Sequence, residues 1–445
     1  MNLRRGTDRC LRLSFIACCV GGLWPYAAAT AADAAHATTP APPNVVLIIS
    51  DDHGWTDYGF MGHEHVRTPR LDRLASQSLV FRRGYVPSSL CCPSLASIVT
   101  GLYLHQHKIT CNDPPMPPGS KPAATMGTAP FREGREVMNR HLEAVPTLPR
   151  LLAQRGYLSL QTGKWWQGDF RRGGFTHGMT QGQRHGDEGL KIGRQTMQPI
   201  FDFIQTARQQ QKPFFVWYAP MLPHQPHVPP PRLLEKYRDQ APSKFVAQYW
   251  AMVEWFDETC GQLLDYLEQQ KLAENTLVLY LADNGWVQTP QAQGPLRSKL
   301  TPYDAGLRTP IMVRWPGRIA PRMSDEFAMS IDLVPTVLAA VGLQRTPEMS
   351  GVNLLDDTAV RSRRAICGEC FVHTAVDLNV PARNLLHRWI IEGRWKLIVP
   401  QAAGGKSELY DLVADPKETQ ESAAAHPDLV RRLQRQLDTW WNPQP

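Results

Sequence analysis

The sequence lacks three features whose absence narrows the kind of protein it encodes. It has no basic run interleaved with aromatic residues, so its formal net charge of +7 gives no reason to expect a nucleic-acid partner. Beyond the N-terminal segment, no apolar run is long enough to span a bilayer, and no stable membrane insertion is expected. It contains one C-x-x-C and no second one, which argues against a zinc or redox site.

The first 31 residues are expected to be a signal peptide. A basic start is followed by an alanine-rich apolar stretch and by A-x-A-like cleavage sites near Ala29. Pro25 and the glycines before it disfavour a membrane anchor, and lipid modification at Cys18 is the weaker alternative. Residues 32–43 are rich in small residues and proline and are expected to form a linker. The protein is therefore predicted to be secreted or periplasmic.

The remaining chain alternates predicted strands and helices, which is typical of an α/β fold with a large, mostly parallel sheet and helices on both faces. Strands are predicted at residues 44–49, 214–218, 276–282 and 310–315, and helices at 67–78, 148–154, 245–269 and 332–341. Residues 112–130 read as a proline- and glycine-rich loop that could roof a site. Beyond residue 342, a hairpin at 389–399 and a terminal helix follow.

Two predicted strands end in oxygen-bearing side chains. Asp51 and Asp52 follow the first strand, and Asp283 and Asn284 follow the strand at 276–282. A single Asp-Asp pair after a strand is more often a turn or a helix cap. If the two strands are neighbours, however, the four side chains form an all-oxygen cluster of the kind that calcium prefers.

Cys91 is a candidate nucleophile. It lies two residues before Pro93, which suits the first turn of a helix, so Cys91 is expected just outside a helix N-terminus. A nucleophile there faces backbone N–H groups that favour an anionic substrate. The alternative is a buried cysteine pair that leads into a core helix.

These segments, in this order, resemble the sulfatase family of the alkaline phosphatase-like superfamily over nearly the whole mature chain. The segments that carry the resemblance are the strand ending in Asp51-Asp52, the C-x-P-S motif at Cys91, Thr162-Gly163-Lys164-Trp165, Pro223-His224-Gln225-Pro226-His227, Ala282-Asp283-Asn284-Gly285, the stretch from Lys299 to Pro310, and Glu408 to Pro416. The resemblance also implies that residues 44–342 form the catalytic α/β domain. Residues 343–445 would then form a small C-terminal subdomain, an antiparallel sheet with a packed helix.

The resemblance implies a sulfuric ester hydrolase whose cysteine, here Cys91, is oxidised to formylglycine by a formylglycine-generating enzyme. The hydrated aldehyde would attack sulfur, and the sulfated hemiacetal would collapse to release sulfate. Lys164 and Lys299 match the lysines that hold the sulfate oxygens, and His224 matches a histidine on the leaving-group side. The implied metal is Ca²⁺, with ligands Asp51, Asp52, Asp283, Asn284 and the modified Cys91.

Two positions depart from the family pattern. Leu95 stands where the family usually has the arginine of C-x-P-x-R, and Trp166 stands where G-K-W-H has histidine. The arginine helps recognition by the modifying enzyme, and the histidine contacts the formylglycine region. His105, His107 or His185 is a possible substitute for the missing histidine.

Three functions are compatible with these residues. The favoured one is a sulfatase that acts on an organic, possibly carbohydrate, sulfate ester, because Trp165, Trp166 and Trp286 lie beside predicted catalytic motifs and could stack on a sugar. Core packing is the more common role for each tryptophan. The alternatives are a phosphodiester or phosphonate hydrolase of the same superfamily, and a non-catalytic relative that binds sulfated glycans.

Six cysteines remain after the predicted cleavage. Cys92 is expected to stay a thiol that faces the core. Cys367 and Cys370 form the C-x-x-C of an exported chain, for which a local disulfide is expected.

Overall fold

The computed structural model describes residues 42–117, 119–120, 122–291 and 297–443. The signal peptide and nearly all of the linker lie outside the described residues, and both stay predictions. Within the described residues, no helix combines the length and the apolar character needed to cross a membrane.

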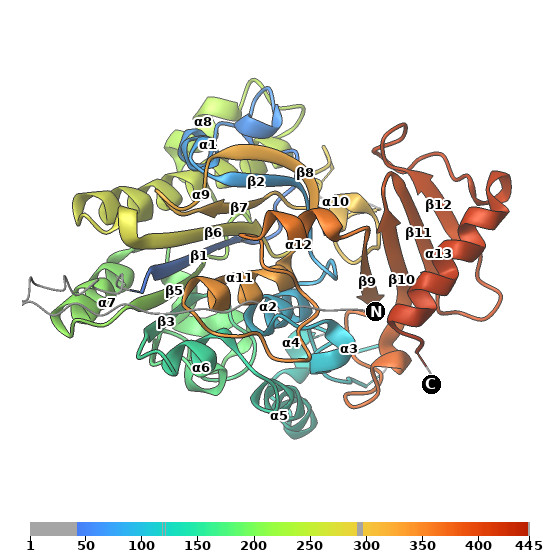
Figure 1. Ribbon diagram of the computed structural model, residues 1–445, viewed down its shortest axis with the longest axis horizontal. Helices are drawn as coiled ribbons and strands as arrows, with labels where there is room; N and C mark the ends of the chain where they lie inside the picture. Colours follow the sequence, from blue (N-terminus) through green and yellow to red (C-terminus); the bar gives the residue numbers. More distant parts are fainter. Residues whose placement is uncertain (1–41, 118, 121, 292–296, 444–445) are drawn as a thin grey trace, which may run out of the picture. The chain divides into compact units, whose positions relative to one another are not determined.

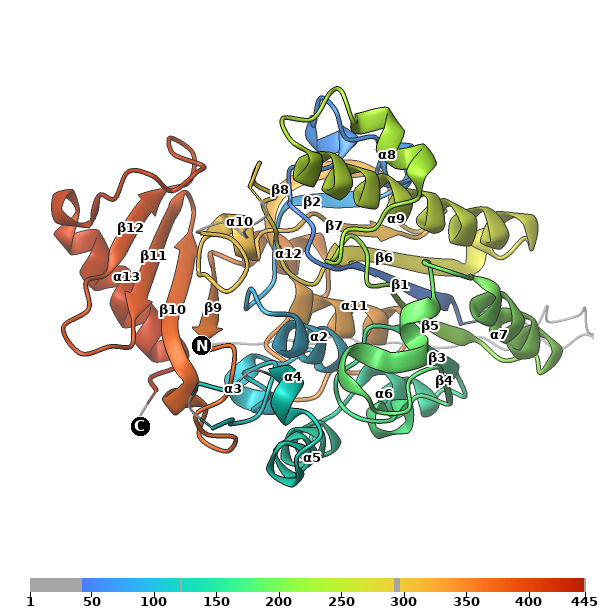
Figure 2. The same ribbon diagram turned by 180° about the vertical axis from the view of Figure 1, so that it is seen from behind.

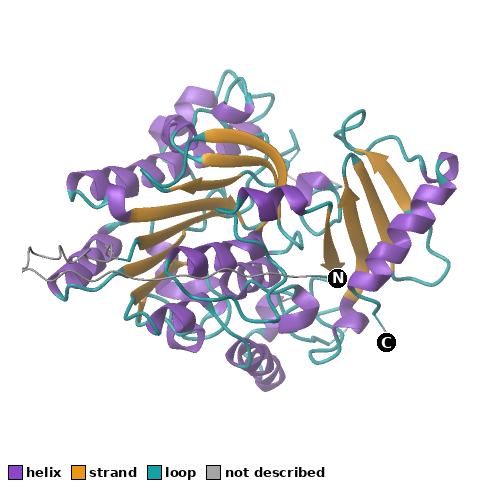
Figure 3. Cartoon of the chain, viewed as in Figure 1, coloured by secondary structure: helices purple, strands orange, loops and turns teal. Residues whose placement is uncertain are grey.

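A large, mostly parallel sheet organises the chain (Figures 1 and 3). Its strands run in the order β4-β3-β5-β1-β6-β7-β2-β8, and β7 is antiparallel to both of its neighbours. The strands are β1 (Asn44–Ser50), β2 (Leu79–Tyr85), β3 (Leu158–Gly163), β4 (His177–Gly178), β5 (Phe214–Ala219), β6 (Thr276–Ala282), β7 (Ile311–Arg314) and β8 (Arg322–Met329). The central strands are mostly apolar and are buried along their whole length, because helices cover both faces.

Alternate side chains of β1 enter two different cores. Leu47 and Ile49 pack with α2 (Cys91–Thr100), α6 (Leu148–Ala153) and α11 (Leu333–Ala340). Val46 and Ile48 pack on the other face with α1 (Pro69–Ser76), α7 (Gln198–Gln209) and α9 (Lys244–Gln269). Figure 2 shows the ribbons of α7 and α9 on this side of the molecule. The remaining helices are α3 (Leu104–His107), α4 (Pro122–Thr125), α5 (Ala129–Glu143), α8 (Pro231–Tyr237), α10 (Asp304–Leu307) and α12 (Asp357–Ser362).

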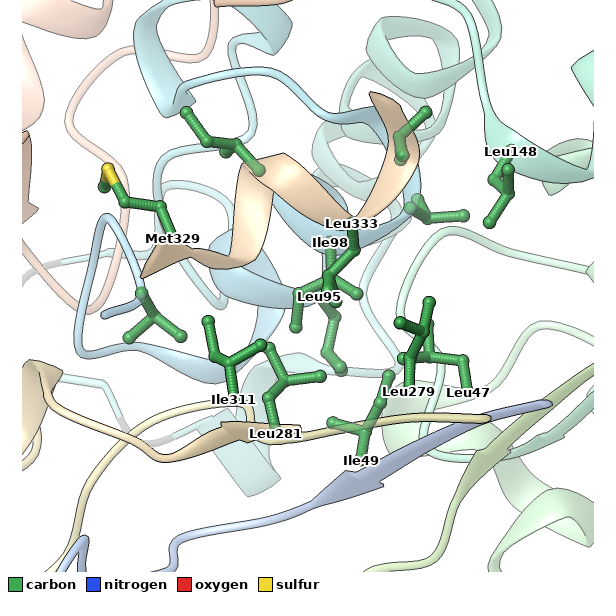
Figure 4. Packing of buried hydrophobic residues seen from close by; sticks show 14 of the residues in the cluster. Leu47, Ile49, Leu95, Ile98, Leu148, Leu279, Leu281, Ile311, Met329 and Leu333 are labelled. Atoms are coloured by element: carbon green, nitrogen blue, oxygen red, sulfur yellow. The ribbon is translucent and has the colours of Figure 1, made fainter. Parts of the chain in front are cut away.

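Leu95 belongs to the first of these cores. Its side chain is 1% exposed, and Figure 4 shows it with Ile98 between Leu333 of α11 and the sheet residues Ile49 and Leu281. The position that departs from the family pattern is therefore filled by an apolar side chain that contributes to packing between α2 and the sheet. A charged side chain there would have to enter this apolar layer.

The C-terminal part of the chain forms a separate antiparallel sheet in the order β12-β11-β10-β9. Its strands are β9 (Ala365–Phe371), β10 (Leu385–Glu392), β11 (Trp395–Pro400) and β12 (Glu408–Asp411). The helix α13 (Pro427–Trp440) covers one face through Leu433 and Leu437, whereas Trp389 and Ile391 on the other face join the core of the large sheet. The predicted fold class, a large parallel sheet with a small antiparallel one, is confirmed.

Two details of the sequence interpretation are wrong. Cys367 and Cys370 are both free thiols, not a disulfide. They lie three residues apart on a single strand, so their side chains leave opposite faces: Cys367 packs under α13, and Cys370 Sγ lies 3.3 Å from the carbonyl oxygen of Leu300. The expected loop at 112–130 contains the short helix α4, and α5 begins inside it.

Candidate active site

Four neighbouring strands of the large sheet end at one edge, and the chain after each supplies a polar side chain. In the order β3, β5, β1 and β6, these are Lys164, His224, the Asp51-Asp52 pair and the Asp283-Asn284 pair. β1 and β6 are parallel, with Ser50 opposite Ala282, so the two acidic ends lie side by side. This adjacency is the condition on which the predicted oxygen cluster depended.

The carboxylates are buried and linked to one another. The N–H of Asp52 donates to Asp283 Oδ1 over 3.2 Å, and Asn284 Nδ2 donates to Asp52 Oδ1 over 2.8 Å. Asp52 has a positive φ of 58°, a left-handed conformation that aspartate adopts more readily than most residues. This turn brings its side chain beside the end of β6.

Two lysines neutralise part of this charge. Lys164 Nζ lies 2.6 Å from Asp51 Oδ1, and Lys299 Nζ lies 2.6 Å from Asp52 Oδ1. Gly163 sets the path of the chain into Lys164: its φ is +75°, and a Cβ there would lie 1.9 Å from the carbonyl oxygen of Ala219.

The mutual positions of these charges perturb their titration. Burial and the neighbouring Asp51 raise the pKa of Asp283 well above its ordinary value. Burial also acts to raise the pKa of Asp52, but Lys299, His224 and Lys164 outweigh it, and that pKa is lowered. Burial acts to lower the pKa of Lys299, but the carboxylates and Cys91 outweigh it, so Lys299 stays protonated.

Cys91 is the first residue of α2 rather than a residue outside it. Its Sγ lies 4.0 Å from Asp52 Oδ1, and burial raises the pKa of the thiol to about 12 although both lysines oppose this. Cys92 points away from this cluster, and Gln167 Nε2 donates to its Sγ over 3.1 Å. Of the two cysteines, Cys91 is thus the one that faces the charged groups.

His224 lies at the rim of the cluster. Its Nε2 is 3.4 Å from Asp52 Oδ2, and its side chain is 17% exposed. Burial and the nearby Lys164 lower its pKa, so the ring is neutral at pH 7. Arg194, a residue that sequence reasoning missed, positions this segment by donating from its guanidinium to the carbonyl oxygens of Met221 and His224.

The donor set fits a hard divalent cation. Ligand atoms of Asp51, Asp52, Cys91 and His224 all lie within 4.8 Å of one another. Among the described residues, Asp283 Oδ2 and Asn284 Oδ1 are buried acceptors without a hydrogen-bond partner, as expected of oxygens that serve as metal ligands. An all-oxygen set from three carboxylates and an amide matches the preference of calcium.

Comparison with known proteins identifies the family. A sulfatase family model matches residues 43–343, and a second model, described as N-sulphoglucosamine sulphohydrolase, C-terminal, matches residues 297–442. The chain belongs to the sulfatase family. The expected enzyme class, a sulfuric ester hydrolase, is confirmed at the level of this family.

Individual relatives agree with this assignment. The chain is 29% identical to N-acetylgalactosamine-6-sulfatase of Canis lupus familiaris, over 74% of this chain and 70% of that one. It is 30% identical to human arylsulfatase A, over 68% of this chain and 64% of that one. The matches therefore span about two thirds of the relatives' lengths.

Solved structures share the fold. The structure of BT4656 in complex with its substrate D-glucosamine-2-N,6-O-disulfate has a TM-score of 0.71 at 19% identity, with 91% of this chain and 99% of that one covered. The phosphonate monoester hydrolase SpPMH from Silicibacter pomeroyi has a TM-score of 0.65 at 19% identity, with 88% and 94% covered. These likenesses concern the fold alone.

Of the three histidines considered as substitutes for the one missing from the sulfatase motif, only His185 lies near the site. Its ring centroid is 6.0 Å from that of His224 and 4.5 Å from the ring of Trp166. His105 is instead paired with Glu369, and His107 is buried against Ser97. His185 has a positive φ of 71° inside an irregular 3-10 segment, which no sequence pattern indicates.

The three tryptophans near the sulfatase motifs are all buried. Trp165 packs on Trp217 and Phe175, and Trp286 belongs to a cluster with Trp250. Trp166 is 2% exposed, and the guanidinium carbons of Arg184 and Arg135 lie 4.8 Å and 5.4 Å from its ring centroid. None of the three exposes a ring face on which a sugar could stack.

Proposed function

We propose that this protein hydrolyses sulfate esters of carbohydrates, with a calcium ion and a formylglycine derived from Cys91. The observation that carries the proposal is the convergence of the buried acidic cluster, two lysines, Cys91 and His224 at one edge of the sheet. The non-catalytic alternative explains less, because binding alone does not require a cysteine against a buried acidic cluster.

The charge balance supports the calcium ion. With all three carboxylates ionised, as metal ligands must be, these groups and the two lysines leave one net negative charge in a buried site, which would repel a sulfate ester. A divalent cation reverses the sign and makes the site attractive to an anion. Asp51, Asp52, Asp283, Asn284 and residue 91 would hold the ion, and it would supply electrostatic stabilisation of the sulfate oxygens.

The lysines and the histidine take separate roles. Lys164 and Lys299 would turn from their carboxylates toward the sulfate oxygens and hold the group with its bridging oxygen outward. His224 lies at the rim and is neutral in the free protein. The anionic sulfate ester bound beside it would favour the protonated ring, which would then donate a proton to the departing sugar oxygen. Arg194 keeps the backbone of His224 in place and acts as a positioning residue.

A modified Cys91 accounts for product release. A thiol that attacked sulfur would keep the sulfate and would have no easy way to release it. Formylglycine, when formed, supplies a hydrated aldehyde with one hydroxyl for attack and a second whose deprotonation expels the sulfate. Leu95 lies in the core below α2, and with this leucine in place Cys91 Sγ lies 4.0 Å from Asp52 Oδ1, beside the charged groups.

The names of relatives support a carbohydrate sulfate as substrate, because several are N-acetylgalactosamine sulfatases and one solved structure contains a sulfated glucosamine. We further propose secretion or periplasmic location through residues 1–31, and maturation by a formylglycine-generating enzyme.

The test is the chemical state of residue 91. Protein co-produced with the modifying enzyme should yield a peptide in which Cys91 carries an aldehyde and Cys92 a thiol. A Cys91→Ser variant should lose sulfatase turnover, whereas Cys92→Ser, the matched control, should keep the aldehyde. An active preparation whose Cys91 is wholly a thiol would refute the mechanism. Activity on phosphonate esters or phosphate diesters alone would favour the alternative hypothesis of a phosphodiester or phosphonate hydrolase.

A further inference from the structure

A cavity of about 710 Å³ lies beside the proposed active site. Its walls come from α5, from Trp166 after β3, and from the 3-10 segment around His185. The charged residues of this lining are Arg132, Arg135 and Arg184. Within the described part of the chain, no carboxylate lines it. The cavity therefore differs from the acidic cluster next to it in the sign of its charge.

His185 places the cavity next to the proposed reaction site. This residue lines the cavity, and its ring centroid lies 6.0 Å from that of His224. Its backbone is held in place, because the N–H of Trp165 donates to the carbonyl oxygen of His185 over 3.0 Å. A substrate whose sulfate is bound by the two lysines would have to extend past His224 and His185 to reach the cavity.

The arginines leave positive charge in this cavity. Arg184 donates from Nε and Nη2 to the two oxygens of the buried Asp113, each over 3.0 Å, and Arg135 Nη2 donates to the same carboxylate over 3.1 Å. One carboxylate thus serves two guanidinium groups, and one positive charge remains. Arg132, three residues before Arg135 on the exposed side of α5, adds another.

The cavity offers a ligand positive charge rather than free buried donors. Trp166 is only 2% exposed, and its Nε1 is buried below the cavity surface, as is Nη1 of Arg135. A ligand in the cavity therefore meets the charge of Arg132 and of the Arg135–Arg184 pair, and this charge favours an anion.

We infer that this cavity binds a second anionic group of the substrate, so that the enzyme prefers glycans that carry another anion on the leaving-group side. The inference rests on the proposed sulfatase function and adds to it a substrate class. The recognised chemistry is a planar or tetrahedral oxyanion, from either a second sulfate or a uronate carboxylate. The guanidinium groups of Arg184 and Arg135 both lie against the ring of Trp166, which helps to fix their positions.

The experiment compares matched disaccharides on the mature enzyme. All carry the same scissile sulfate, and the neighbouring sugar carries a second sulfate, a carboxylate or no charge. The wild type should show a higher kcat/KM for at least one doubly anionic substrate. Arg132→Gln and Arg135→Gln should each lower the ratio of doubly to singly anionic kcat/KM by about tenfold or more, mainly through KM.

The matched control is Arg140→Gln, which removes the same charge from the exposed side of α5, where Arg140 contacts Glu136. It should leave the ratio unchanged. Arg132 is exposed and its variant should fold even if that of Arg135, bonded to Asp113, does not. The arm with the larger ratio identifies the second anion as a sulfate or a carboxylate.

Binding is measured separately from turnover. Calorimetric titration of a Cys91→Ser protein with the doubly anionic disaccharide should show affinity that Arg132→Gln weakens by a similar factor. If no ester is hydrolysed but this binding difference persists, the proposed function fails and the anion cavity stands. If neither second anion raises kcat/KM in the wild type, or if Arg132→Gln and Arg135→Gln lower the ratio no more than Arg140→Gln, the inference is wrong.

Discussion

Replacing Lys396 should destabilise the contact between the small sheet and the loop that carries Lys299. Lys396 is fully buried, and its Nζ lies 2.9 Å from Asp304 Oδ1 and 2.8 Å from Glu418 Oε1. A Lys396→Met variant would leave two carboxylates facing each other without a cation. Removing one partner of a buried ion pair costs about 3–5 kcal/mol, which is a large part of a typical stability of about 5–15 kcal/mol.

The loss should depend on pH in a defined direction. Burial already raises the pKa of Glu418 and Lys396 opposes that rise, so the variant raises the pKa further. When the pKa of a carboxyl is higher in the folded than in the unfolded state, the protonated form favours folding. The free energy of unfolding therefore falls as the pH rises through the pKa of the folded state. The loss of stability in Lys396→Met should therefore be largest above pH 7 and should become smaller toward pH 5.

Urea unfolding at pH 8 and pH 5 measures both effects. Lys406→Met removes an exposed lysine from the loop between β11 and β12 and serves as the control. Lys396→Met combined with Glu418→Gln should recover part of the lost stability, because one carboxylate is gone. Activity should fall as well, since Glu418 Oε2 accepts from the N–H of Asp304, which ends the loop that carries Lys299. A Lys396→Met protein as stable as Lys406→Met at pH 8 would refute the reasoning.

Three further predictions concern the site and its support. Asp283→Ala should abolish calcium binding and activity while the fold remains, as metal analysis and circular dichroism would reveal; full turnover under strong chelation would contradict the calcium assignment. His224→Ala should slow alkyl sulfate esters much more than activated aryl esters, and equal losses would leave His224 as a binding residue only. Leu95→Ala should cost about 2–5 kcal/mol in urea unfolding. Leu95→Met should cost less than about 1.5 kcal/mol, and equal effects would argue against a packing role.

The strand-end cluster could be predicted from the sequence because apolar strands have a period and a length, and parallel strands present their carboxyl ends at one edge. Asp51 and Asp283 were reached in this way. Lys299 and His224 lie on irregular segments, and they were placed only by resemblance to the family.

The cavity lined by Arg132, Arg135 and Arg184 could not be predicted from the sequence. Asp113 and Arg184 lie 71 positions apart, and their contact depends on how the chain before α4 packs against the 3-10 segment around His185. The disulfide was wrongly predicted because C-x-x-C spacing does not distinguish a turn from a strand. Lys396, a lysine between apolar residues of β11, was the one visible signal of a buried ion pair that sequence reasoning passed over.

The position of the cavity lined by Arg132, Arg135 and Arg184 also indicates how substrate specificity could be transferred from one relative to another. One wall of the cavity is formed by α5, which precedes β3, and the other by the chain that follows β3. A single contiguous stretch of about 112–190 therefore contains both walls. Within that stretch, Lys164 follows β3 at the shared edge of the sheet, and the other residues of the proposed active site lie outside the stretch. Grafting this stretch between relatives would exchange the recognition of the neighbouring sugar while the remaining strands keep the ester-cleaving apparatus of the recipient.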